Sequence, residues 1–267
     1  MAKAKKQYSQ RSASQFNIWR SIFQILVCKI GYMVRLKLVY RIEIHGLENV
    51  PKDNKYIICP NHLSTLDPPL ICAIMPRRVA FMAKKELFDI PFIRWWIDWL
   101  GAFAVNRESL GPSTVKTVRT IQESNWVLGM FPQGTRGVPG EIKGVTKGFA
   151  GLAKLTKCDI LPVGIIGSNE VKRWPFTGKI IVNIGEVIPY DKNPDIVKDK
   201  WITEIQKLTG FTYIEDNQAE LVRGAVGSGQ QEAKKEGAAP AKKKKFVVVH
   251  NPENSRDKKS PERRPQT

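Results

Sequence analysis

Two residues suited to acid–base chemistry stand five positions apart in this chain. His62 and Asp67 belong to the segment Pro60-Asn61-His62-Leu63-Ser64-Thr65-Leu66-Asp67-Pro68. An imidazole and a carboxylate at this separation can meet across a tight turn, and the carboxylate then fixes the tautomer and orientation of the ring. His62 would act as a general base on an attacking alcohol. A structural role is the alternative, because Asp67 before Pro68 has the form of a helix N-cap followed by proline.

Three later segments complete a series, and one of them is suited to binding an anion. They are Gly101-Ala102-Phe103-Ala104-Val105-Asn106-Arg107, Phe131-Pro132-Gln133-Gly134-Thr135-Arg136 and Ile160-Leu161-Pro162-Val163-Gly164. Gly134 lets the backbone approach an anion closely, Thr135 supplies a hydroxyl donor, and Arg136 can bind phosphate through a fork of two hydrogen bonds. Taken alone, the segment Phe131–Arg136 would more readily indicate a glycine-containing turn beside a surface arginine.

In this order and spacing, the four segments resemble the motifs of the glycerolipid acyltransferases, the 1-acyl-glycerol-3-phosphate acyltransferase family, whose first motif is His-x4-Asp. The resemblance covers most of residues 56–170. It implies transfer of a fatty acyl group from coenzyme A or acyl carrier protein to a glycerophosphate hydroxyl, with no metal, no cofactor and no covalent enzyme intermediate. His62 and Asp67 would be catalytic. Phosphate of the acceptor would be held by Arg107 and by the third motif, which contributes Gln133, Gly134, Thr135 and Arg136.

The family usually carries Glu where this chain has Gln133. The amide keeps the size and can still accept a hydrogen bond from a glycerol hydroxyl, but the charge is lost. The expected acceptor is 1-acyl-glycerol-3-phosphate (lysophosphatidic acid), which would give phosphatidic acid in phospholipid biosynthesis. Another lysophospholipid and glycerol 3-phosphate remain alternatives. A non-catalytic lipid-binding protein is disfavoured by the intact His62 and Asp67.

Two further groups of residues are candidates for contacts with the donor or the membrane. Lys84 and Lys85 follow an expected strand and could reach the thioester or the phosphates of the donor, although a solvated charge run is the alternative. A helix face would carry four amphipathic aromatic residues, which suit a membrane interface as well as a protein core. These are Phe92, Trp95, Trp96 and Trp99.

The chain around these motifs alternates short apolar runs with helical patterns, which predicts an α/β domain with a largely parallel sheet flanked by helices over residues 43–216. His62 would follow the first strand, and such sheets bind ligands beyond the carboxyl ends of their strands. The expected strands are 56–59, 79–82, 102–105, 126–131, 160–166 and 179–184. The expected helices are 68–75, 91–100, 113–123, 145–156 and 195–208.

Basic residues are concentrated at the two ends of the chain. Of the net charge of +18, residues 1–41 contribute nine, residues 42–217 three and residues 218–267 six. Polybasic ends suit an anionic membrane surface or a nucleic acid. Because the middle of the chain is nearly neutral and lacks a known nucleic-acid-binding motif, nucleic acid is not the expected partner. The four cysteines lack CxxC spacing, so neither a zinc site nor a disulfide framework is predicted.

Residues 1–42 are predicted to form a basic arm and an amphipathic segment. Lys29 interrupts the apolar run and no cleavage site follows it, which excludes both a signal peptide and a spanning helix. We predict a helix in the membrane interface, on the cytoplasmic face of a peripheral or monotopic protein; a helix packed on the protein's own core is the alternative. One stripe of the helix is mostly polar: Asn17, Arg20, Ser21, Gln24, Cys28, Gly31 and Arg35.

The last part of the chain, residues 217–267, is rich in Gly, Ala, Lys and Glu and includes the run Lys242–Lys245. Such a composition offers little apolar surface to offset the entropy lost on ordering. A disordered basic tail is therefore predicted.

Overall fold

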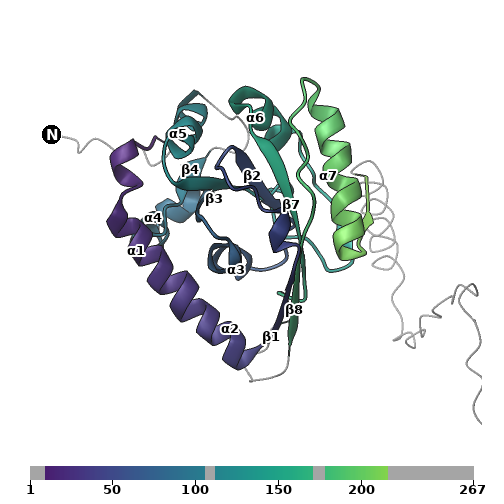
Figure 1. Cartoon of the computed structure of the whole chain (residues 1–267), viewed down its shortest axis with the longest axis horizontal. Helices are drawn as coiled ribbons and strands as arrows, with labels where there is room; N and C mark the ends of the chain where they lie inside the picture. The colour runs from purple at the N-terminus through teal and green to yellow at the C-terminus, as the bar shows by residue number, and fades with distance from the viewer. Residues whose placement is uncertain (1–9, 106–111, 171–177, 216–267) are drawn as a thin grey trace, which may run out of the picture. The chain divides into compact units, whose positions relative to one another are not determined.

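The structure, a computed structural model, describes residues 10–105, 112–170 and 178–215. Its centre is a seven-stranded sheet (Figure 1) in which every neighbouring pair is parallel except β7 and β8. This confirms the predicted α/β fold with a largely parallel sheet flanked by helices. In sheet order, the strands are β1 (Arg41–His45), β8 (Lys179–Ile184), β7 (Asp159–Ile166), β2 (Tyr56–Pro60), β5 (Trp126–Gly129), β3 (Arg78–Lys84) and β4 (Phe103–Val105).

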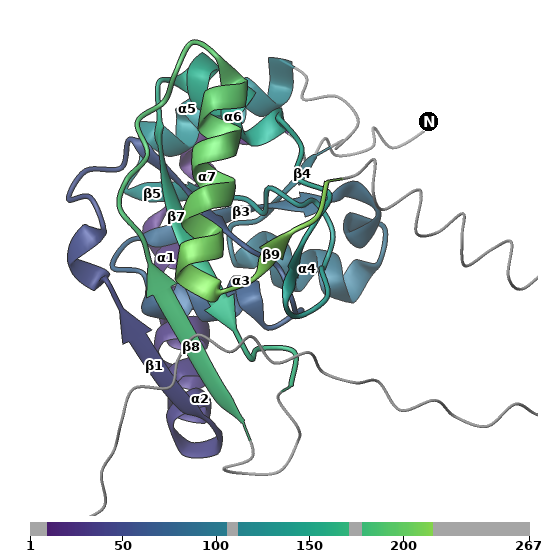
Figure 2. The same cartoon turned by 90° about the vertical axis from the view of Figure 1, so that its right-hand side faces the viewer.

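Helices cover both faces of this sheet, as Figures 1 and 2 show. One face carries α5 (Pro112–Gln122), α6 (Gly148–Thr156) and α7 (Pro194–Thr209), and the other carries α3 (Asp67–Ile74) and the N-terminal helices. The side chains of the central strand β2 alternate between the two cores. Ile57 and Cys59 pack with α5, α6 and α7, whereas Tyr56 and Ile58 pack with α3. A strand buried on both faces needs such a continuous apolar run.

The N-terminal segment forms a run of helical turns along the α3 side of the sheet. After a short 3₁₀ turn (Ala13–Gln15), it comprises α1 (Ile18–Gln24), a π-helical stretch (Ile25–Tyr32) and α2 (Met33–Val39). Ser21, Gln24 and Cys28 of the predicted polar stripe are buried against the domain. The Gln24 amide group donates to the Val79 carbonyl at 2.9 Å and accepts from the Val79 N–H at 3.1 Å.

The opposite side of this segment is apolar and exposed. We call these residues the apolar ridge, and they are Ile18, Trp19, Ile22, Leu26, Ile30, Val34 and Leu38. Packing on the protein's own core therefore holds for Ser21, Gln24 and Cys28, while the apolar ridge faces outward and membrane contact stays a prediction. Within the described residues, no helix has the length and apolar character needed to cross a membrane.

A further helix, α4 (Pro91–Trp99), lies next to α1 and is preceded by a 3₁₀ turn, Lys85–Phe88. The ring of Phe23 contacts Trp95, Trp96 and Trp99, with centroid distances of 6.1, 5.7 and 5.5 Å. Phe92 and Trp95 are exposed. The predicted aromatic face of this helix is therefore shared between contacts with α1 and the surface.

The structure adds a strand that was not predicted and corrects two boundaries. Strand β1 was not predicted; its exposed and half-buried residues alternate, as suits a strand that pairs only with β8 at the sheet edge. The strand expected over 126–131 ends at Gly129, and the Phe131 carbonyl accepts from the N–H of Gly134 in the turn that follows. The helix expected over 145–156 begins at Gly148. Between them lies a long loop with a two-residue strand β6 (Glu141–Ile142), paired with β9 (Thr212–Tyr213). The tail predicted over 217–267 lies outside the described residues.

Candidate active site

The turn that carries His62 starts from a fixed strand end. Asn61, which follows β2, is buried, and its side chain exchanges two hydrogen bonds with the backbone of Ile165 in β7. Its Nδ2 donates to the Ile165 carbonyl at 2.9 Å, and its Oδ1 accepts from the Ile165 N–H at 2.6 Å. These bonds extend the contact between β2 and β7 past the last strand residue. They fix Asn61, and so the backbone directly before His62.

His62 and Asp67 are in direct contact. The Nδ1 atom of His62 lies 2.8 Å from Oδ2 of Asp67, and the same oxygen accepts hydrogen bonds from the N–H groups of Leu63 and Ser64, both at 2.7 Å. Asp67 is completely buried. It is the first residue of α3, and the N-cap is Leu66. Asp67 therefore binds N–H groups that precede the helix, and the N-cap arrangement considered from the sequence is not formed.

This arrangement sets the chemistry of the imidazole. An ionised carboxylate only accepts hydrogen bonds, so Nδ1 carries the proton and Nε2 keeps a free lone pair. The ring of Phe131 stacks on the imidazole with a centroid distance of 3.9 Å and an angle of 20° between the planes. His62 has 16% of its side chain exposed and lines the adjoining cavity. The contacts with Asp67 and Phe131 thus hold the imidazole in one orientation at the wall of a cavity.

The cavity beside His62 has a volume of about 690 Å³ and is mainly apolar. Its walls come from the N-terminal helical run, α3, β3 and α4, through side chains such as Val27, Pro69, Phe81 and Trp96. A volume in this range is typical of pockets for small organic ligands. Besides His62, the described lining includes the basic residues Arg35 and Lys84.

Tyr32 connects the N-terminal run to the turn between His62 and Asp67. Its hydroxyl donates to the carbonyl oxygen of Leu66 at 3.2 Å, and its ring lines the cavity. Burial, followed by the negative charge of Asp67, raises the pKa of Tyr32 well above its ordinary value. The phenol therefore stays neutral and remains a hydrogen-bond donor.

The loop with the third motif adjoins His62. The N–H of Gly137 donates to the His62 carbonyl at 2.7 Å. Gly134 adopts a left-handed conformation with φ of 66°, which glycine tolerates without strain. Thr135 and Arg136 are exposed, whereas Gln133 is buried. The structure thus brings the first and third motifs together.

The remaining predicted site residues divide into three cases. Lys84 lines the cavity and has Glu86 at 3.8 Å, while Lys85 is exposed at the beginning of the following 3₁₀ turn. Arg107 lies outside the described residues.

The sequence interpretation gave no role to Tyr32 or Phe131, although both contact the His62–Asp67 turn. For Phe131, the available signal was an aromatic residue inside a motif.

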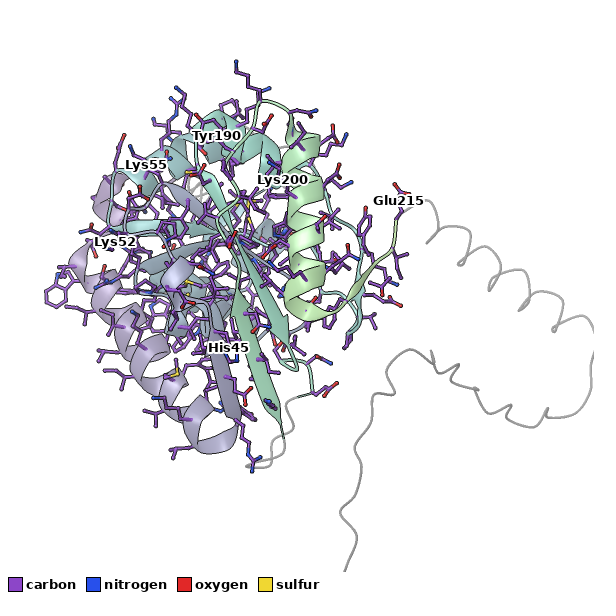
Figure 3. The ribbon with its side chains drawn as sticks, turned by 45° about the vertical axis from the view of Figure 1, so that its right-hand side comes forward. His45, Lys52, Lys55, Tyr190, Lys200 and Glu215 are labelled. Atoms are coloured by element: carbon purple, nitrogen blue, oxygen red, sulfur yellow. The ribbon has the colours of Figure 1, made fainter. Side chains whose placement is uncertain are left out.

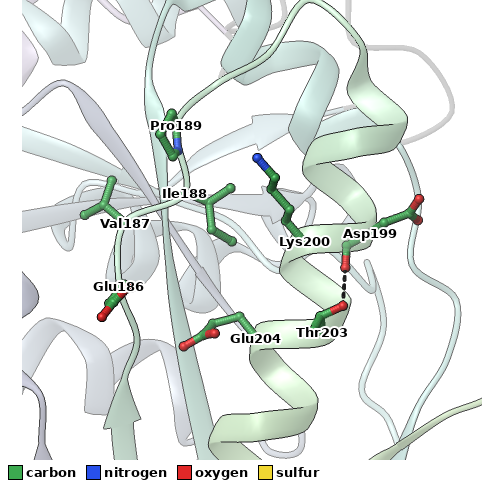
Figure 4. A pocket seen from close by; sticks show the side chains of 8 residues that line it. All are labelled: Glu186, Val187, Ile188, Pro189, Asp199, Lys200, Thr203 and Glu204. Carbon is green, nitrogen blue, oxygen red and sulfur yellow. Dashed lines mark hydrogen bonds between the residues drawn. The ribbon is translucent and has the colours of Figure 1, made fainter.

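Elsewhere, the described residues offer no comparable arrangement of a base and a carboxylate. His45 is exposed on β1 (Figure 3), and its imidazole lies 4.0 Å from Glu43. A second groove lies between α7 and residues 186–189 (Figure 4) and is lined by acidic residues, Lys200 and Thr203, whose hydroxyl donates to the Asp199 carbonyl. Within the described part of the chain, no group of three or more His, Cys, Asp or Glu is placed to hold a metal ion.

Comparison with known proteins gives the class of enzyme. Residues 41–166 match the family model described as Acyltransferase. The chain is 31% identical over 160 residues to the 1-acyl-sn-glycerol-3-phosphate acyltransferase of Bacillus subtilis, an alignment that covers 60% of this chain and 79% of that protein. The enzyme of the same name from Streptococcus pneumoniae is 32% identical over 174 residues, which are 61% of this chain and 64% of that protein.

A solved structure agrees with these matches. It is the crystal structure of the 1-acyl-sn-glycerophosphate (LPA) acyltransferase PlsC from Thermotoga maritima, similar with a TM-score of 0.56 and 27% sequence identity, over 71% of this chain and 80% of that one. The fold and the matches together define an acyltransferase enzyme with an α/β domain. The chain belongs to the 1-acyl-sn-glycerol-3-phosphate acyltransferase family, as its four motifs predicted.

Proposed function

We propose that the protein transfers a fatty acyl group from coenzyme A or acyl carrier protein to the free hydroxyl of 1-acyl-glycerol-3-phosphate, giving phosphatidic acid. The observation that carries this proposal is the contact between His62 and the buried Asp67, because it leaves Nε2 of His62 as a base beside an apolar cavity. In the reaction, the hydroxyl oxygen forms a bond to the thioester carbonyl carbon, and His62 takes the hydroxyl proton. The C–S bond then breaks, and the leaving thiolate receives that proton.

Asp67 would stabilise the imidazolium that forms while His62 holds the proton. General base catalysis of this kind contributes about 10²- to 10⁴-fold to the rate, and alignment of the two substrates can contribute more. No nucleophilic side chain takes part, so the acyl group passes directly from sulfur to the acceptor oxygen. His62 and Asp67 are the catalytic residues in this proposal.

The substrates would occupy different parts of the site. The fatty acyl group fits the apolar cavity, and the acceptor phosphate would lie at the third motif, where Gly134, Thr135 and Arg136 are close in sequence to the Gly137–His62 contact. Arg107 is expected to join them. Lys84, on the cavity wall, and the neighbouring Lys85 are proposed to face the donor.

The apolar ridge and the exposed aromatic residues of α4 are proposed to contact the cytoplasmic face of a membrane, as in a peripheral or monotopic protein. An exposed apolar surface on a helix flanked by basic residues favours the membrane interface. The nine basic residues and no acidic residue within 1–41 would strengthen binding to anionic lipids. The cavity, walled by the N-terminal run and α4, would then open near the lipid phase. Residues 217–267 would add a disordered basic tail.

An assay of acceptors and donors tests this function. Purified full-length protein is incubated with lysophosphatidic acid, glycerol 3-phosphate and lysophosphatidylcholine, each with acyl-CoA and with acyl carrier protein charged with the same chain. We expect the highest kcat/KM with lysophosphatidic acid, because it combines an exposed phosphate with a lipid chain. Preferred use of lysophosphatidylcholine or glycerol 3-phosphate would reassign the acceptor, and no turnover of any acceptor would reject acyl transfer to these hydroxyls.

Arg136→Lys is expected to raise the acceptor KM about tenfold, because one ammonium group cannot reproduce the two parallel hydrogen bonds of a guanidinium. The effect on kcat should be smaller. Steady-state kinetics with lysophosphatidic acid as the varied substrate measure both constants. The matched control is Arg119→Lys, at an exposed position of α5 on the face of the sheet opposite to the cavity. It should change neither the acceptor KM nor kcat. Wild-type kinetics in the Arg136 variant would remove this residue from the site.

A further inference from the structure

Gln133 stands in the third motif, where contact with the acceptor was expected, but its side chain is bound to the protein's own backbone. It is only 5% exposed. Its Oε1 accepts a hydrogen bond from the N–H of His62 at 2.9 Å, and its Nε2 donates to the carbonyl of Lys143 at 3.3 Å. Both ends of the side-chain amide are therefore engaged.

The chemistry of the two partners fixes the orientation of this amide. The backbone N–H of His62 can only donate, so it must face the oxygen of Gln133, and the carbonyl of Lys143 can only accept, so it must face the nitrogen. An ionised Glu could accept from His62 but would place a second oxygen against the Lys143 carbonyl. The two backbone partners therefore suit the amide of Gln133 better than a carboxylate.

The same loop also binds the other polar group of the His62 backbone. The carbonyl of His62 accepts from the N–H of Gly137 at 2.7 Å. A Cβ atom at Gly137 would lie 3.0 Å from Nε2 of Gln133, so glycine leaves room for the amide. The ring of Phe131, from the start of this loop, stacks on the imidazole. The loop therefore contacts the N–H, the carbonyl and the ring of His62.

We propose that Gln133 is a positioning residue, which holds the backbone of His62 so that the imidazole reaches both Asp67 and the acceptor hydroxyl, and that it does not bind the acceptor. The inference rests on the proposed function, in which His62 is the general base. A displacement of about 1 Å in a reacting group can cost about 10²-fold in rate. A change at Gln133 should therefore lower kcat and leave the acceptor KM nearly unchanged.

Two substitutions separate positioning from acceptor binding. Gln133→Leu removes both hydrogen bonds at similar size, and we expect kcat to fall about tenfold or more with the acceptor KM within about twofold of wild type. Gln133→Glu keeps an oxygen for the His62 N–H, so its kcat should lie between those of Gln133→Leu and the wild type. Gln122→Leu is the matched control, because the Gln122 amide also donates to a backbone carbonyl, that of Thr156, away from the cavity. This control should lower the melting temperature without changing kcat.

A spectroscopic measurement makes the test independent of turnover. The Nδ1 proton of His62, hydrogen-bonded to Asp67, should give a downfield proton resonance, assigned by its loss in His62→Ala. We expect this resonance to shift or broaden in both Gln133 variants and to persist unchanged in Gln122→Leu. If the wild-type protein showed no acyl transfer, the proposed function would be rejected. The resonance would still show whether Gln133 holds His62 in place.

Three results would overturn the inference. One is a kcat in Gln133→Leu close to that of the wild type. Another is a tenfold rise in acceptor KM with unchanged kcat in either variant, which would return Gln133 to acceptor binding. The third result applies if Gln133→Leu does not fold. In that case, a wild-type His62 resonance together with a wild-type kcat in Gln133→Glu would overturn the inference.

Discussion

Asp67→Asn is expected to fold with nearly wild-type stability and to lose at least about 10²-fold in kcat. The Asn oxygen can still accept from Leu63 and Ser64, so the turn before α3 should persist. The neutral amide cannot stabilise the imidazolium of His62, and if it donates to Nδ1 it imposes the tautomer that lacks a base at Nε2. The analogous change in a serine protease triad costs about 10⁴-fold.

Thermal melting together with steady-state acyl transfer measures both parts of this prediction. His62→Ala gives the rate without a base. Asp195→Asn is the control for loss of a carboxylate, since Asp195 pairs with Lys147 at 2.6 Å on the surface at the start of α7. Exposed pairs of this kind contribute little to stability, so the control should resemble the wild type. A folded Asp67→Asn enzyme within a few-fold of wild-type kcat would end the proposed role of the His–Asp pair.

The sequence predicted the features that depend on local pattern. Alternating apolar runs and helical segments indicated the parallel sheet, and the separation of His62 and Asp67 suited contact across a strand-to-helix turn. Strand β1 was missed although the sequence of residues 41–45 alternates polar and apolar residues, because the apolar run before them obscured its start. Its register with β8, which places Arg41 opposite Lys179, depends on long-range packing.

The contacts of Gln133 could not be predicted for a related reason. Its partners are backbone atoms of His62 and Lys143, and a backbone N–H or carbonyl has no residue type that a sequence pattern could reveal. The cavity raises the same difficulty, because its walls come from elements that are separated along the chain. Residue types indicated a base and an anion-binding loop, but the way the loop supports the base depends on long-range packing.

Removing the apolar ridge is expected to release the protein from membranes without unfolding it. Trp19, Leu26, Ile30 and Leu38 are 69, 54, 53 and 64% exposed, so their replacement by Gln costs little packing in the domain. Deleting residues 1–41 would be a poorer test, because it would also remove the buried residues Cys28 and Leu36 from the core. Full burial of a Leu side chain stabilises by about 1.5–3 kcal/mol, so losing four partly inserted side chains should lower vesicle partitioning about 100-fold or more.

Sedimentation with phosphatidylglycerol vesicles at low and high salt measures this effect. The variant should keep some binding at low salt, because its basic residues still attract the anionic surface, and should lose it at high salt, where these charges are screened. A matched control replaces four exposed apolar residues on other elements, Leu47, Val138, Leu155 and Ile196, by Gln. This control should bind like the wild type at both salt concentrations. Equal high-salt binding by the ridge variant and the wild type, or equal loss in the control, would contradict membrane docking through the apolar ridge.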